Sequence, residues 1–124
     1  MLEIKNIKIY KPISRDKLID IYCSADILFV HLNNLKAFEK VLPSKIFELA
    51  SFSKPILAGL SGFSANFIRN EVSHSYVFNP CDDVDMIKKL NEIKDVKINR
   101  SDFIMKYKRS SIDSAFVKSI ISYL

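Results

Sequence analysis

The sequence predicts an α/β fold in which a mainly parallel sheet is flanked by helices. Three short apolar runs, residues 27–30, 55–58 and 76–78, have the composition of buried strands. Segments with helical apolar spacing and short polar loops separate these runs, and this alternation is typical of parallel sheets. The chain has 124 residues and no linker rich in Pro, Gly or Ser, so we predict one domain over residues 1–124.

The first third of the chain predicts a strand, a helix and a second strand. Residues 6–10 alternate apolar with charged or polar side chains, which is typical of a short strand. Ser14 is a candidate N-cap for the helix that follows. Because residues 27–30 are continuously apolar, we expect a strand that is buried on both faces. Residues 33–42 lack periodicity and are expected to form a loop.

The middle of the chain predicts two more strands with helices between them. Ser44 is expected to cap a helix, and Pro55 is allowed at the first position of the next strand. A turn at residues 59–62 leads to a short helix over residues 63–69. The strand at 76–78 follows, and Asp82 or Asp83 is expected to cap the helix after it.

Two closing helices are predicted over residues 101–108 and 112–123. The second has an apolar stripe at helical spacing, which includes Ile112, Phe116 and Ile120. Such a stripe is more often part of a core than a membrane-binding surface. We therefore expect this stripe to be buried.

Composition excludes several classes of protein. The net charge is +5, from 19 Lys and Arg against 14 Asp and Glu, but the basic residues are scattered, so we expect no nucleic-acid partner. Cys23 and Cys81 form no metal-binding motif, and we expect a reduced, cytoplasmic protein with no metal and no cofactor. No apolar stretch approaches the length of a membrane span. With two glycines, neither G-x-G-x-x-G nor a P-loop is present.

The candidate binding residues follow the predicted strands or begin a helix. In open parallel sheets, ligands bind at the carboxyl ends of the strands, where His31 and Asn33 are expected. At Ser44 and Lys45, a helix start and a positive charge favour phosphate, and Glu48 lies one turn further on. Glu48 can accept hydrogen bonds from ribose hydroxyls. The alternatives are that Lys45 and Glu48 form an exposed surface pair, and that His31 is a hydrogen-bonded histidine at a strand end.

Three ordered motifs resemble a known family. YCSADILFVHL (22–32), PSKIFELA (43–50) and KPILA (54–58) resemble the second-domain core of retaining GT-B glycosyltransferases of the group-1 (GT4) type. The similarity is strongest to the bacterial branch that builds O-antigen, capsule or colanic-acid polysaccharides. It covers nearly the whole chain and implies a Rossmann-like fold and transfer of a sugar, with retention of configuration, from a UDP- or GDP-sugar.

The resemblance also implies roles for individual residues. Glu48 matches the second Glu of the family's E-x7-E motif, which hydrogen-bonds the nucleotide ribose. Lys40 lies where the motif has its first Glu, which in the family is expected to hold the donor hexose. A lysine at this position could instead contact the donor phosphate or a carboxylated sugar. Ser44 and Lys45 fall at the donor-facing helix start, and His31 and Asn33 are further candidates for contact with the donor.

The resemblance is to part of an enzyme. The sequence resembles the latter two-thirds of the second GT-B domain, so the acceptor domain and the first two strands of the donor domain have no counterpart in it. No catalytic residue is identified, and we expect the isolated chain to be inactive. The lipid-linked or saccharide acceptor would meet the missing domain, in the cytoplasm or at the inner face of the bacterial plasma membrane.

Two other classes of function are considered. The alternative is a non-catalytic α/β module that binds a nucleotide or a partner chain. An upstream reading frame that encodes a Rossmann-like domain would favour the enzyme over this module. A receiver domain of the response-regulator kind is disfavoured because its acidic cluster is missing from this sequence.

The missing strands predict an open sheet edge. In the strand order 3-2-1-4-5-6, strands 1 and 2 separate the third strand from the fourth. By the resemblance, residues 6–10 are the third strand and residues 27–30 the fourth. Either residues 6–10 pair directly with the exposed edge or a partner chain supplies the lost strands. We therefore expect the isolated chain to be oligomeric or poorly soluble.

Overall fold

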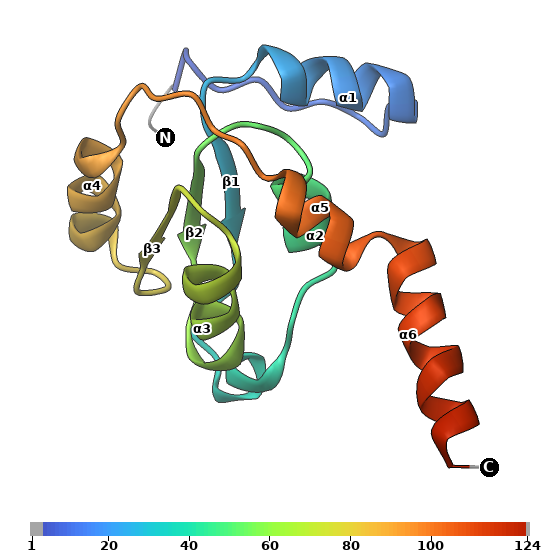
Figure 1. Cartoon of the computed structure of the whole chain (residues 1–124). Coiled ribbons are helices and arrows are strands. Elements are labelled where there is room, and N and C mark those ends of the chain that lie inside the picture. Colours follow the sequence, from blue (N-terminus) through green and yellow to red (C-terminus); the bar gives the residue numbers. More distant parts are fainter. Residues whose placement is uncertain (1–3, 124) are drawn as a thin grey trace.

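A computed structural model of the chain describes residues 4–123, which fold around a three-stranded parallel sheet (Figure 1). The strands are β1 (Leu28–His31), β2 (Ile56–Gly59) and β3 (Ser75–Phe78), in the order β1-β2-β3. The register pairs Leu28 with Ile56, and Ile56 with Ser75. The predicted α/β fold with a parallel sheet and flanking helices is therefore confirmed, with strand boundaries shifted by about one residue.

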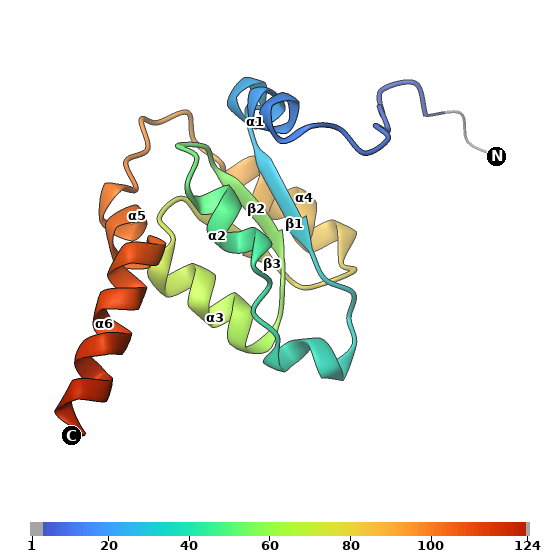
Figure 2. The same ribbon diagram turned by 90° about the vertical axis from the view of Figure 1, so that its right-hand side faces the viewer.

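The two faces of the sheet carry different helices. Helices α2 (Lys45–Ala50) and α3 (Gly62–Glu71) lie on one face, and α4 (Asp83–Glu92) lies on the other (Figure 2). The main core lies on the α2 and α3 side, because alternate strand residues point there. It joins strand residues with helix residues such as Leu28, Val30, Ile56, Ile46 and Ile68.

The α4 face is only partly covered. α4 packs against β3 and β2, and Phe29, at the middle of β1 on this face, remains 53% exposed. The prediction that the strand at residues 27–30 is buried on both faces is therefore wrong. A continuous apolar run indicates that both faces of a strand are hydrophobic, but each face of the strand is buried only where another element covers it.

Residues 6–10 do not form a strand, and the prediction of an opening strand there is wrong. These residues lie outside the sheet, and the side chain of Ile9 is 94% exposed. The segment leads to α1 (Arg15–Ser24), which lies across the amino-terminal end of β1 (Figure 1). Ser14 occupies the N-cap position of α1, but its side chain makes no capping hydrogen bond. An alternating pattern forms a strand only where a partner edge lies within reach.

α4 begins with a side-chain cap. Asp82 occupies the N-cap position, and its Oδ1 accepts a hydrogen bond of 2.9 Å from the Asp85 N–H. Asp85 Oδ2 in turn accepts from the Asn79 N–H at 2.8 Å. Of the two predicted caps, Asp82 is therefore the one that the structure contains.

The final helices are α5 (Ser101–Tyr107) and α6 (Arg109–Ser122), close to the predicted ranges. α5 packs against α2 through Phe103, whereas α6 extends away from the body of the molecule in both views (Figures 1 and 2). No residue of α6 is buried, and Phe116 is 66% exposed. The expectation that the apolar stripe of this helix lies in a core is therefore wrong for this chain, because α5 alone provides too little surface to cover α6.

The connection between α4 and α5 is tied down by Arg100, which is 4% exposed. Its Nη1 donates to Phe52 O at 2.6 Å, and its Nε and Nη2 donate to Ser73 O at 3.0 and 2.8 Å. These carbonyls lie just after α2 and α3, at helix ends that favour a positive charge. Burial lowers the pKa of Arg100 to about 10, so the guanidinium remains charged at neutral pH.

No helix within residues 4–123 combines the length and the apolar character needed to cross a bilayer.

Candidate functional site

The predicted helix start at Ser44 and Lys45 is the beginning of α2. α2 has six residues and follows a short 3₁₀ helix, η1 (Lys36–Lys40). η1 lies within the segment predicted to be a loop. Ser44 has helical backbone angles, φ −59° and ψ −25°, and its side chain makes no capping bond. The predicted Ser44 cap is therefore wrong, because a capping residue needs extended backbone to turn its oxygen back to the helix.

Lys45 and Glu48 form an ion pair on α2. The Lys45 Nζ lies 2.6 Å from Glu48 Oε2, and the two side chains are 47% and 25% exposed. Lys45 Nζ also lies 3.4 Å from the hydroxyl oxygen of Tyr22 on α1. The hydrogen bond to Glu48 is the main reason that the pKa of Lys45 is raised above its ordinary value, and burial opposes it in part. The exposed pair named as the alternative is thus present in this structure.

The pair does not use all of its hydrogen-bonding positions within residues 4–123. Glu48 Oε1 accepts no hydrogen bond from residues 4–123, and an ionised carboxylate has about four acceptor positions. Lys45 has a flexible side chain and three donor positions. Glu48 can therefore accept hydrogen bonds from hydroxyl groups, and Lys45 can attract an anion. This chemistry suits a diol beside a phosphate.

His31 lies on the other face of the sheet. Its Nε2 accepts a hydrogen bond of 3.1 Å from the Cys81 N–H, so the strand-end hydrogen bond of the alternative interpretation is present. Its ring is nearly parallel to that of Phe29, at 4° and 6.2 Å between centroids, and it also stacks with Phe78. An accepting Nε2 places the proton of the neutral ring on Nδ1. Phe29, His31 and Phe78 therefore form an aromatic cluster at the carboxyl end of the sheet.

A cavity of about 280 Å³ lies beside this cluster. Its lining is mainly apolar and includes the two carboxylates of Asp82 and Asp83 at the start of α4. The lining residues are Phe29, His31, Phe78, Cys81, Asp82, Asp83 and Met86. The cluster requires Gly59 at the end of β2, because a β-carbon there would lie 2.3 Å from His31 Cδ2 and 2.6 Å from the Phe78 ring. The backbone of Cys81 adopts a positive φ of 62° beside this cluster.

Asn33 and Lys40 form no hydrogen bond with either group of residues within residues 4–123. Asn33 is exposed in the loop after β1, and Lys40 is exposed at the end of η1. η1 packs against the start of α3, where Gly62 has a φ of 61° and a β-carbon would lie 2.2 Å from Glu39 O. The structure therefore pairs Lys45 with Glu48, and it shows no hydrogen bond that joins Lys40, Asn33 or His31 to that pair within residues 4–123.

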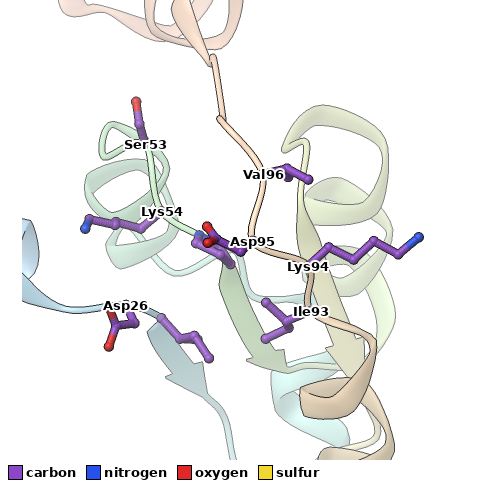
Figure 3. A pocket seen from close by; sticks show the side chains of 9 residues that line it. Asp26, Ser53, Lys54, Ile93, Lys94, Asp95 and Val96 are labelled. Atoms are coloured by element: carbon purple, nitrogen blue, oxygen red, sulfur yellow. The ribbon is translucent and has the colours of Figure 1, made fainter.

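A separate cavity of about 460 Å³ lies at the opposite edge, near the amino ends of β1 and β2 (Figure 3). It is lined by the connection between α1 and β1, by residues 53–55 and by the connection after α4. Lys54 and Lys94 border it, but their side chains extend in opposite directions (Figure 3). The cavity therefore does not combine with the predicted site at the carboxyl end of the sheet.

Sequence reasoning missed two contributors to these sites. Tyr22 lies close to Lys45, with Nζ 6.0 Å from the centroid of its ring, yet 23 positions separate them and no local pattern links them. The stacking of Phe29 with His31 had a signal, since residues two apart in a strand share a face. Within residues 4–123, no group of three or more His, Cys, Asp or Glu side chains is placed to hold a metal ion.

Comparison of the chain with protein-family models, with curated proteins and with solved structures gives no match.

Proposed function

We propose that this chain is the donor-nucleotide-binding part of a retaining bacterial glycosyltransferase. In this proposal the donor is a UDP- or GDP-sugar, and the acceptor is a growing surface polysaccharide or a lipid-linked saccharide held by a separate acceptor domain. The chain alone binds the nucleotide and transfers no sugar. A cytoplasmic location at the inner face of the plasma membrane fits the net charge of +5, which attracts anionic lipid.

The Lys45–Glu48 pair on α2 is the observation that carries the proposal. Glu48 combines a partly exposed carboxylate, an Oε1 that accepts no hydrogen bond from the described residues, and an adjacent cation. A nucleoside diphosphate presents two ribose hydroxyls and a phosphate chain, which match this combination of an acceptor and a positive charge. On nucleotide binding, Lys45 would turn from Glu48 to the phosphate while Glu48 accepts from the ribose.

The order of elements around the pair also supports the proposal. The segment PSKIFELA includes α2, KPILA includes the start of β2, and the YxxAD motif leads from α1 to β1. The motifs that resemble the glycosyltransferases therefore belong to consecutive elements around one parallel pair, β1 and β2.

The test is calorimetric titration of the purified chain with UDP and GDP. We expect one of them to bind, and Glu48→Ala to weaken that binding by at least about tenfold, because losing a hydrogen bond to a charged group costs about 1.5–3 kcal/mol. Glu92→Ala is the matched control, because Lys89 and Glu92 on α4 form an ion pair with the same spacing. Absence of binding, or equal effects of the two variants, would refute the proposal.

A further inference from the structure

The outer edge of β1 carries unpaired peptide groups. The Leu28 N–H donates to Pro55 O at 2.9 Å and the Leu32 N–H donates to Gly59 O at 3.0 Å, both in the direction of β2. Successive peptide groups of a strand point to opposite edges, so those of Phe29 and His31 point away from β2. Neither forms a backbone hydrogen bond with a residue between 4 and 123. β1 is thus an open edge strand.

Residues 7–10 have the complementary property: they have the pattern of a strand, but they pair with no strand in the part of the chain that the structure describes. Their apolar side chains are exposed: Ile7 by 59%, Ile9 by 94% and Tyr10 by 60%. Isoleucine and tyrosine are among the residues that favour strands. One chain therefore contains an open edge and an unpaired strand-forming segment.

We propose that residues 7–10 of a second copy of this chain pair with the open edge of β1, and that the two copies exchange these segments reciprocally. The partner strand would extend each sheet from three strands to four. Addition of a strand satisfies the outward peptide groups of Phe29 and His31 through main-chain hydrogen bonds. A reciprocal exchange closes across a two-fold axis and leaves neither segment unpaired.

The path of the chain favours a second copy over pairing within one molecule. Tyr10 and Ile13 border a groove with Lys17, Asp20 and Ile21 of α1, so the segment runs back along that helix. The segment before α1 extends away from the sheet (Figure 2). Its strand-forming residues are therefore presented to a neighbouring molecule rather than to their own β1.

The side chains of the segment match the surface beside β1. In an extended strand, Lys5, Ile7, Ile9 and Lys11 lie on one side, with two isoleucines between two lysines. The α4 face beside β1 has a half-exposed Phe29, an apolar cavity and the carboxylates of Asp82 and Asp83 at its carboxyl end. Isoleucine can cover Phe29, and one lysine reaches the carboxylates whichever way the strand runs.

The first measurement is light scattering over a concentration series, on the chain and on two variants. The first variant, called Ile9→Pro below, also carries Tyr10→Pro. The added strand lies at the edge of the sheet, where only alternate N–H groups face β1, and two consecutive prolines remove the inward-facing N–H in either strand direction. Phe116→Ser is the control, because it removes an exposed aromatic side chain from α6, far from β1. We expect a dimer for the chain and for Phe116→Ser. For Ile9→Pro we expect either a monomer or a dimer whose dissociation constant is at least about tenfold higher.

Amide hydrogen exchange measures directly whether the outer edge of β1 is paired. We expect the Phe29 and His31 amides to be protected in the dimer and unprotected in Ile9→Pro, whereas the Leu28 and Val30 amides stay protected in both because they face β2. Three results would overturn the proposal. These are a chain that stays monomeric at every concentration, a dimer that Ile9→Pro leaves intact, and protection of Phe29 and His31 in the monomer, which would show that the segment pairs with its own β1.

Discussion

Lys45 and Glu48 lie three residues apart on α2, with Nζ 2.6 Å from Oε2. Both side chains are partly exposed, and such surface ion pairs contribute about 0–1 kcal/mol to stability. Their removal therefore leaves the fold nearly as stable as before. A loss of nucleotide binding in a Glu48 variant would consequently report on ligand contact rather than on unfolding.

Glu48→Gln should lower the free energy of unfolding by less than about 1 kcal/mol. The amide keeps the shape of the carboxylate and can still accept a hydrogen bond from Lys45, while the charge is lost. Urea denaturation followed by circular dichroism measures this change, with Glu92→Gln on α4 as the control of equal spacing. A loss above about 2 kcal/mol would show that Glu48 has a structural role which the exposed pair does not explain.

Lys40→Glu should weaken binding of a nucleoside diphosphate, and the effect should be larger at low salt. The change replaces a positive charge by a negative one at the end of η1, and screening weakens repulsion between exposed charges. Lys88→Glu on α4 makes the same change of charge on another helix and serves as the control. Binding that stays unchanged, or that Lys88→Glu weakens equally, would contradict a contact between Lys40 and the donor phosphate.

Arg100→Met should destabilise the chain by about 2–4 kcal/mol, because it leaves the carbonyls of Phe52 and Ser73 without their charged donor. Arg100→Lys should recover only part of this loss, since an ammonium cannot reproduce the geometry of the guanidinium. Chemical denaturation compares both with Arg69→Met, an exposed arginine on α3. Equal stability of the Arg100 and Arg69 variants would contradict the structural role of Arg100.

Acid should weaken the packing of α5 on α3 through Glu71. Its Oε2 accepts from Lys106 Nζ at 2.6 Å and from the Tyr107 hydroxyl at 2.8 Å. These bonds, led by that from Lys106, lower the pKa of Glu71 below its ordinary value of 4.5. A lowered folded-state pKa gives stability that is present above that value and lost as the pH falls through the folded-state pKa.

Glu71→Gln should therefore reduce the loss of stability on acidification from pH 6 to about pH 3. Tyr107→Phe should have a smaller effect in the same direction, because it removes one of the two bonds. Urea denaturation at several pH values measures the slope. A slope that is the same in Glu71→Gln and in the unmodified chain would contradict this assignment.

The fold was largely predictable because the strands of this chain are short apolar runs with clear boundaries. Residues 55–58 are followed by Gly59, and residues 76–78 by Asn79 and Pro80, so both runs have sharp ends. Their helical connections favour parallel pairing, which the structure contains. Local pattern was sufficient wherever an element lies within the core.

Local pattern was insufficient wherever the result depends on a neighbour. Among residues 4–123, the segment 6–10 has the alternation of a strand but no adjacent sheet edge, and α6 has an apolar stripe that no core covers. Arg100 is buried in a polar connection because two distant carbonyls bind it, a relationship that no nearby residue signals. In the candidate site, the spacing of Lys45 and Glu48 predicted their pairing, whereas the approach of Tyr22 depends on the folded chain.

The most direct test of the central claim is a residue-resolved NMR titration of the ¹⁵N-labelled chain with UDP and with GDP. We expect the amide shifts of residues 44–48 and the side-chain signals of Lys45 to change together and saturably with the nucleotide that binds. The shifts of α4 and α6 should stay constant. Changes confined to the cavity at residues 53–55 and 93–96, or no saturable change with either nucleotide, would contradict the assignment of α2 as the donor-nucleotide site.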